Sequence, residues 1–114
     1  MQFMTPAWFD DSTFFRVEAF EQYEGVCVYE CHLSSDEKSL GFPNGYVANY
    51  ITFDSKAIVY IVKGDISIET SGAHNHMKSG QAAVFEKDES IHLNGSGSMF
   101  IVTEKKFDFN GLIG

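Results

Sequence analysis

The fold is decided by the stretch Ile58-Val59-Tyr60-Ile61-Val62-Lys63-Gly64-Asp65-Ile66-Ser67-Ile68. It opens with an unbroken apolar run, continues through Lys63-Gly64, and ends with isoleucines that alternate with polar side chains. This pattern predicts two β-strands joined by a glycine turn, which is a β-hairpin. Further along the chain, Ser79-Gly80 and Gly95-Ser96-Gly97 stand between apolar segments and predict two more turns. The region from Ala57 to His92 therefore indicates consecutive hairpins.

Outward from this region, short apolar or alternating segments recur between turn residues. The predicted strands cover residues 14–23, 26–33, 46–53, 58–62, 65–70, 74–78, 82–86, 90–94 and 99–103. Residues 14–23 also fit a helical spacing, but the strand is the preferred interpretation. Residues 34–45 are the most polar stretch and predict a surface loop. About nine strands at this spacing are typical of an all-β sandwich or small barrel.

The length and composition predict one domain with its own core. The 114 residues are enough to bury a core without disulfides or metals, so we expect a single domain spanning residues 1–114. Residues 1–12 carry several aromatic side chains and predict an N-terminal arm or edge strand that docks on a neighbouring surface.

The charge balance excludes two classes of partner. The chain has 16 acidic and 8 basic side chains, a net charge of −8, so nucleic-acid phosphates and anionic membranes would repel it. We therefore expect neither direct nucleic-acid binding nor membrane binding. No leader-like segment and no apolar run of about 20 residues is present, which predicts a cytoplasmic protein.

The two cysteines are expected to be free thiols. Cys27 and Cys31 lie in one predicted strand, where their Cα atoms would be about 13 Å apart. That separation is far beyond the reach of a disulfide. Free thiols agree with a reducing compartment.

Three segments together resemble the cupin superfamily, the RmlC-like jelly rolls. Residues 58–68 resemble the family's strand-turn-strand core, Met77 to Phe85 resembles its next glycine turn, and Ile91-His92-Leu93 lies near the histidine of its second motif. The resemblance covers residues 46–103 and implies a double-stranded β-helix, the cupin jelly-roll barrel.

The sequence departs from the pattern of metal-binding cupins. Counted back from Gly64, the family's glutamate ligand falls on Ala57, and its His-x-His ligands fall within residues 50–53, which contain no histidine. His92 alone cannot hold a divalent ion in the way that three or four ligands can. We therefore expect no metal and no cofactor.

His92 heads the list of candidate site residues, with two opposite orientations open. If it points into the barrel, Asn94 shares its face and Ile91 and Leu93 point away; in the other register, Ile91 and Leu93 fill the core and His92 faces solvent. Tyr50 and Thr52 stand where metal-binding cupins place ligands and could bind a small polar ligand. The predicted ligand-binding residues are thus His92, Tyr50, Thr52 and Asn94.

The remaining histidines are given a structural interpretation. His74 and His76 form a His-x-His pair about 6.6 Å apart in strand geometry. Such a pair can bind zinc, but no carboxylate or cysteine is near it in the sequence, and two histidines at a rim are the simpler interpretation.

Two functional hypotheses follow. The first is a metal-free, non-enzymatic cupin-like domain that binds a small polar molecule or a protein partner, with a sensory or regulatory role. The alternative is a metal-independent sugar epimerase, isomerase or lyase with His92 as general base and Tyr50 as acid. An open cavity holding both residues would favour the alternative. In either case we expect a homodimer, because jelly rolls have sheet edges to cover and the chain has 11 Phe. The sequence does not identify the ligand.

Overall fold

The protein is a β-structure throughout the residues described by its computed structural model, which are 1–11, 15–34, 50–70 and 73–106. The strands are β1 (Trp8–Asp11), β2 (Phe15–Tyr23), β3 (Val26–Leu33), β4 (Tyr50–Thr52), β5 (Ala57–Thr70), β6 (Ala73–Lys78), β7 (Ala82–Phe85) and β8 (Ser90–Thr103). All strand pairs are antiparallel. The all-β prediction is confirmed. Within the described ranges, no helix is long and apolar enough to span a membrane.

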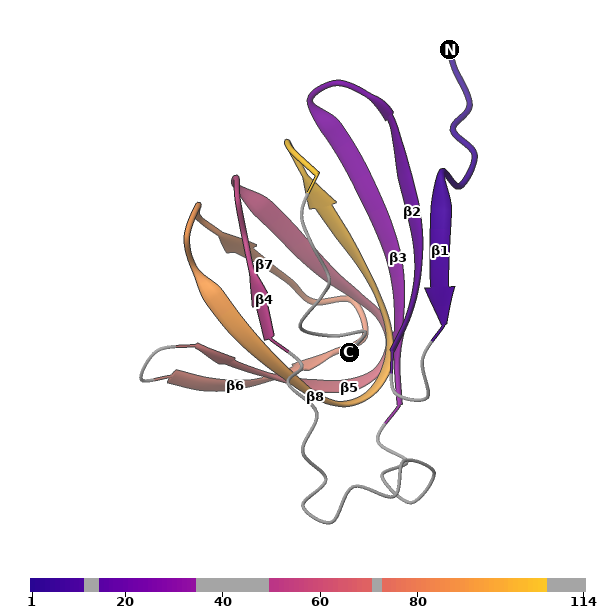
Figure 1. The fold of residues 1–114 in the computed structure, drawn as a ribbon. Coiled ribbons are helices and arrows are strands. Elements are labelled where there is room, and N and C mark those ends of the chain that lie inside the picture. Colours follow the sequence, from indigo (N-terminus) through magenta and orange to yellow (C-terminus); the bar gives the residue numbers. More distant parts are fainter. Residues whose placement is uncertain (12–14, 35–49, 71–72, 107–114) are drawn as a thin grey trace.

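Two layers share the long strands β5 and β8. The larger sheet contains β1, β2, β3, the second half of β8, the first half of β5, and β7. The smaller sheet contains β4, the first half of β8, the second half of β5, and β6. Figure 1 shows β5 and β8 curving side by side from one layer to the other.

The structure corrects the two glycine turns predicted in the middle of these strands. Lys63-Gly64 lies inside β5, and Gly95-Ser96-Gly97 lies inside β8, so neither closes a hairpin. Instead Gly64 pairs with Gly97 where the two strands bend together. A Cβ on Gly64 would lie 2.3 Å from the carbonyl oxygen of Ser96, so only glycine allows this close approach. The sequence pattern could not separate a turn from a bend, because both need glycine at positive φ.

The other predicted elements agree with the structure where it describes them. The segment from Val26 to Leu33 is β3 with unchanged bounds, and the described residues 15–23 of the predicted strand 14–23 form a strand rather than a helix. Ser79-Gly80 is a turn between β6 and β7, with Gly80 at a φ of 89°. β1 pairs with β2 at the sheet edge, as expected for an N-terminal edge strand. The predicted loop 34–45 lies outside the described residues from residue 35 on, as do residues 46–49 of the predicted strand 46–53.

One apolar core fills the space between the layers. Its buried side chains come from both sheets: Val17, Ala19, Cys27, Tyr29, Cys31, Leu33, Ile51, Phe53, Ala57, Val59, Ile61, Ile66, Ile68, Met77, Phe85, Ile91, Leu93, Met99 and Ile101. Cys27 and Cys31 are free and buried, as predicted. Glu21 links the strands at the edge of the larger sheet. Its carboxylate accepts hydrogen bonds of 2.6 Å from Trp8 Nε1 and Tyr29 Oη.

Candidate functional site

A cavity of about 420 Å³ lies between the two sheets, where β6 and β7 flank β5. Its floor is apolar and is formed by Ile68 on β5, Met77 on β6 and Phe85 on β7, all of which are buried. Phe85 is held in place by stacking on Phe53, with ring centroids 5.4 Å apart. Ala82 and Ala83 on β7 also line the cavity, and their small side chains leave space between the larger groups. An apolar floor of this kind suits the hydrophobic body of a small molecule.

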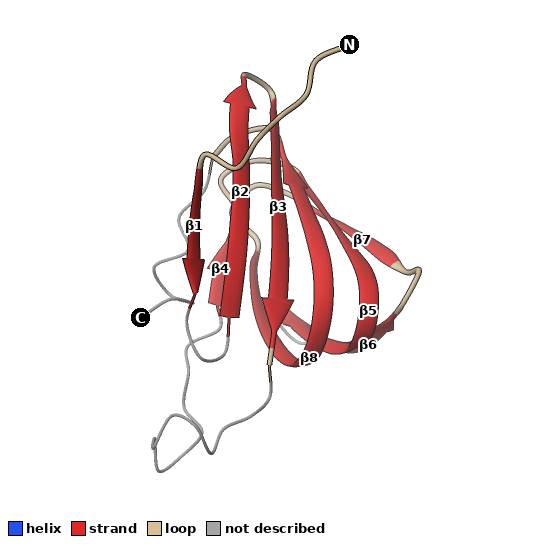
Figure 2. Ribbon diagram, turned by 90° about the vertical axis from the view of Figure 1, so that its right-hand side faces the viewer, coloured by secondary structure: helices blue, strands red, loops and turns tan. Residues whose placement is uncertain are grey.

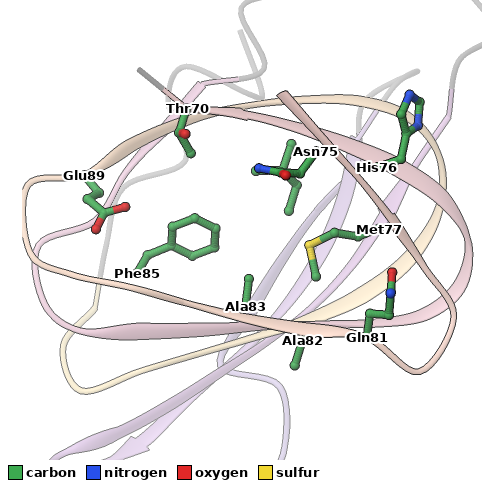
Figure 3. A pocket seen from close by; sticks show the side chains of 10 residues that line it. Thr70, Asn75, His76, Met77, Gln81, Ala82, Ala83, Phe85 and Glu89 are labelled. Atoms are coloured by element: carbon green, nitrogen blue, oxygen red, sulfur yellow. The ribbon is translucent and has the colours of Figure 1, made fainter. Parts of the chain in front are cut away.

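Polar side chains surround the floor. Thr70, Asn75, Gln81 and Glu89 line the same cavity, and Figure 3 shows Thr70 and Glu89 at one end with Phe85 beside them. Asn75 lines the cavity because side chains alternate between the two faces of β6. Asn75 and Met77 pair with Ile68 and Ile66, which are buried core residues, so their face of β6 is the inner one.

The Glu89 carboxylate is positioned by a tight turn. Asp88 has a φ of 71°, and the backbone N–H of Glu89 donates to the carbonyl of Glu86 at 3.2 Å. Glu89 Oε1 accepts a hydrogen bond of 3.2 Å from the Glu86 N–H. Two backbone hydrogen bonds then tie the turn to Phe53, one donated by Phe53 to Glu89 and one donated by Asp88 to Phe53. The negative charge therefore stands at a fixed place beside the apolar floor.

Of the two registers left open for His92, the structure has the one in which His92 faces outward. Ile91 and Leu93 are fully buried, whereas His92 lies on the opposite, outer face of β8. There its Nδ1 is 3.6 Å from Glu69 Oε2 on β5. The described residues thus give no support to the enzyme hypothesis, which needs His92 inside the barrel.

The other predicted ligand-binding residues lie on β8 and on its neighbour β4. Tyr50 pairs with His92 in the β4–β8 register. Thr52 is exposed and its hydroxyl is 2.7 Å from that of Ser90. Asn94 lines a shallow hollow of about 290 Å³ on the outer face of the smaller sheet. The structure thus places Tyr50 and Thr52 on β4 and His92 and Asn94 on the neighbouring β8, and Thr52, His92 and Asn94 do not line the cavity between the sheets.

His74 and His76 also lie on the outer face of the smaller sheet. Their ring centroids are 5.4 Å apart, His74 Nε2 is 2.5 Å from Ser67 Oγ, and His76 Nδ1 is 3.4 Å from Asp65 Oδ1. His76, one of the two histidines that sequence reasoning singled out, also lines the cavity between the sheets, whereas Asn75 and Met77 were not singled out as site residues. The alternation of side chains along β6 could have predicted which residues face the cavity, because Met77 is apolar and indicates the inner face of the strand.

Solved structures with the same architecture are found despite low sequence identity. KdgF from Halomonas sp. matches with a TM-score of 0.68 and 12% identity over 92% of this chain and 96% of its own. An RmlC-like cupin from Shewanella frigidimarina matches with a TM-score of 0.61 and 7% identity over 84% of this chain and 81% of its own. The chain has the cupin fold. A cupin superfamily protein from Desulfitobacterium hafniense agrees, with a TM-score of 0.63 and 10% identity over 82% of this chain and 80% of its own.

These likenesses reach the fold and no further, because all identities are low. No family model matches the sequence, and no curated protein matches it. The RmlC-like jelly roll expected from the sequence is thus confirmed at the level of fold.

The residues of this chain do not fit the metal site that the family pattern implies. The residue at the glutamate position, Ala57, is buried, and the inward-facing residues of the His-x-His region are Ile51 and Phe53. Methyl and phenyl groups offer no lone pair to a metal ion. Across the part of the chain that the structure describes, no group of three or more His, Cys, Asp or Glu residues could hold a metal.

Proposed function

We propose that this cupin-fold domain binds a small amphipathic molecule in the cavity between its sheets and acts as a binding module rather than an enzyme. The observation that carries the proposal is the cavity of about 420 Å³, which combines an apolar floor with a few polar groups. Cavities of this size and lining are typical of small-molecule sites. Inward-facing Ala57, Ile51 and Phe53, in place of metal ligands, support a metal-free mode of binding.

The charge at the site favours neutral or cationic ligands over anions. Glu89 supplies a carboxylate at one end of the floor, and the whole chain carries a net charge of −8. An anion would be repelled by both, whereas a cationic group beside Glu89 would gain Coulomb energy. Asn75 and Thr70 add hydrogen-bonding groups on the paired strands β6 and β5. The ligand class is therefore a molecule with an apolar body and a neutral polar or cationic end.

A pair of matched dyes tests this proposal. Diphenylhexatriene is neutral, its trimethylammonium derivative is cationic, and both become fluorescent in apolar surroundings. We expect saturable binding of both dyes, with the cationic dye bound several-fold more tightly because of Glu89, a difference of about 1 kcal/mol. Glu89→Gln keeps an oxygen for the Glu86 N–H and should remove that difference while leaving the neutral dye's affinity unchanged.

A cavity-filling variant tests whether the dyes bind in the cavity between the sheets. Ala83→Leu inserts about three carbon atoms into the cavity and should weaken both dyes at least about tenfold by steric exclusion. Ala7→Leu makes the same change at an exposed site beside β1 and serves as the control. Dye binding that is absent in the wild type, or that survives Ala83→Leu unchanged, contradicts the proposal.

A sensory or regulatory role in the cytoplasm is part of the same proposal. Binding without catalysis suits a module that reports ligand concentration to a partner. The two free, buried thiols of Cys27 and Cys31 support a reducing compartment. Fractionation of the native host, followed by detection of the protein with a specific antibody, would place it in or outside the cytoplasm.

A further inference from the structure

The pair Asn94-Gly95 lies in the first half of β8, on the outer face of the smaller sheet. Asn94 is exposed, and it lines the shallow hollow of about 290 Å³ on that face, so water reaches its side-chain amide. On β5, Ser67 pairs with Asn94 and Ile66 pairs with Gly95. Figure 2 shows β8 and β5 curving side by side through this region.

The backbone nitrogen of Gly95 is held against the side chain of Asn94. The Gly95 N–H donates a hydrogen bond of 2.9 Å to Asn94 Oδ1. The carbonyl carbon Cγ is bonded directly to Oδ1, so the nitrogen and this electrophilic carbon are neighbours in the folded protein. Two groups that are held next to each other react without first losing the entropy of finding each other.

Glycine after Asn94 is required by the packing of β8 on β5. Gly95 has a φ of 109°, which an L-residue with a side chain rarely adopts. A Cβ at this position would lie 2.5 Å from the carbonyl oxygen of Asp65. The fold therefore keeps a residue without a side chain here, and nothing on its own α-carbon shields the nitrogen that faces the Asn94 amide.

We propose that Asn94 is a self-modification site, at which the folded protein converts its own asparagine into aspartate and isoaspartate. In the first step the Gly95 nitrogen forms a bond to Asn94 Cγ and gives up its proton. The side-chain nitrogen leaves with that proton as ammonia, and a five-membered cyclic imide remains. In the second step one water molecule opens the imide. Cleavage at the side-chain carbon gives aspartate, and cleavage at the main-chain carbon gives isoaspartate; neither step oxidises or reduces any group.

Both products change the smaller sheet. Either one adds a negative charge to a chain whose net charge is already −8, in the row that Asn94 shares with Ser67 and His76. Isoaspartate also lengthens the main chain of β8 by one methylene group, because the chain then runs through the former side chain. This disturbs the pairing of Gly95 with Ile66 and of the residues that follow it. The modification does not depend on a ligand in the cavity between the sheets.

Incubation of the folded protein in oxygen-18 water, followed by tryptic peptide mapping, tests the proposal. Products formed during incubation carry heavy oxygen, which separates them by mass from products formed during digestion in ordinary water. Trypsin places Asn94 on the peptide 88–105, apart from the other two Asn-Gly pairs, which lie on the peptides 39–56 and 107–114. We expect the peptide 88–105 to gain the label progressively, at a rate at least equal to that in urea, where the positioning is lost. A methyltransferase specific for isoaspartyl carboxyl groups should methylate part of the product.

Asn75 is the matched control within the same molecule. It is also exposed and belongs to the same sheet, but it is followed by His76 and lies on its own peptide, 64–78. Its label should appear at least about tenfold more slowly, because a residue with a side chain is less free to bring its nitrogen to the amide. Equal labelling of Asn75 and Asn94 would show that the Gly95 geometry is not the cause and would refute the proposal.

The variant Asn94→Gln keeps the amide but places it one methylene group further from the Gly95 nitrogen. It should lose the label on the peptide 88–105 and keep the far-ultraviolet circular dichroism of the wild type. A label that persists in Asn94→Gln would assign the reaction to another residue of this peptide. That result would overturn the proposal, and so would a wild-type peptide that gains label only in urea.

Discussion

At the scale of single residues, Gly64 has a large predicted effect on stability. It has a φ of 92°, and a Cβ added there would lie 2.3 Å from the Ser96 carbonyl oxygen and 2.6 Å from the Gly97 Cα. Gly64→Ala should therefore lower the free energy of unfolding by the cost of the left-handed conformation, about 1–2 kcal/mol, and by a further 2 kcal/mol or so from displaced backbone. Urea unfolding followed by Trp8 fluorescence measures the loss.

Gly80 provides the control for this prediction. Its φ is 89°, nearly that of Gly64, but a Cβ there would have nothing within 4 Å. Gly80→Ala should cost only the conformational part, about 1–2 kcal/mol. Equal losses in the two variants would show that the close approach of β5 and β8 does not constrain residue 64.

Cys31 predicts a pH dependence of stability. Burial raises the pKa of its thiol well above the usual range, and the Glu30 carboxylate adds to the rise. The unfolded chain loses this proton near pH 8.5, whereas the folded chain keeps it. Above that pH the unfolded state binds fewer protons, so the free energy of unfolding falls as the pH rises, by up to about 1.4 kcal/mol per pH unit.

Comparison with Cys31→Ala isolates this contribution. Urea unfolding from pH 7.5 to 10 should show a shallower decline for Cys31→Ala than for the wild type, after the constant offset from the lost sulfur is subtracted. Every other titrating group is common to both proteins. Parallel pH profiles would mean that the thiol ionises equally in the folded and unfolded chains.

At the scale of elements, the orientation of β8 can be tested through two adjacent residues. Leu93 is fully buried, whereas His92 is on the outer face with its side chain 28% exposed. Leu93→Ala should lower the free energy of unfolding by about 2–5 kcal/mol, and His92→Ala by less than about 1 kcal/mol. Thermal unfolding of both variants decides between the registers, since the reverse order would place His92 inside.

The sequence could predict the alternation of β8 but could not choose which set of residues faces inward. A strand with apolar and polar residues in strict alternation fits either face until its partner strands are known. The family resemblance favoured an inward-facing His92, whereas the apolar side chains of Ile91 and Leu93 favoured the opposite register. The structure has the register that buries the larger apolar area. In β3 no such conflict exists, because Cys27, Tyr29 and Cys31 alternate along the strand and all three are buried.

Strand length was harder to predict than strand position. Residues 58–62 and 65–70 were placed correctly, but the glycine between them was given the commoner role of a hairpin turn. In the structure, the positive φ of Gly64 serves a bend within one strand of 14 residues. The pairing of Gly64 with Gly97 makes this glycine a bend rather than a turn. The two residues are far apart in the sequence, so no local pattern could predict their contact.

At the scale of the whole molecule, the shared strands couple the two sheets. β5 and β8 run through both layers, and the core is continuous between them. The cavity lies where β5 bends between the segment that pairs with β7 (residues 57–60) and the segment that pairs with β6 (residues 65–70), so the site depends on both sheets. Residues that line it come from β5, β6, β7 and the turns on either side of β7. The candidate site could not be predicted from any one segment for this reason.

This coupling predicts that the two sheets unfold together. Opening the smaller sheet alone would break the pairs of β8 with β5 and expose Ile91, Leu93 and Ile68 to water, at a cost of about 1.5–3 kcal/mol for each side chain. Native-state hydrogen exchange should therefore give the slowest amides of the larger sheet, such as that of Tyr29, and those of the smaller sheet, such as that of Leu93, the same free energy of opening. The same value should follow from urea unfolding. If the amides of β4, β6 and the first half of β8 exchange with a free energy lower by 2 kcal/mol or more, the smaller sheet opens as an independent unit, and its half of the cavity would form and dissolve without the larger sheet.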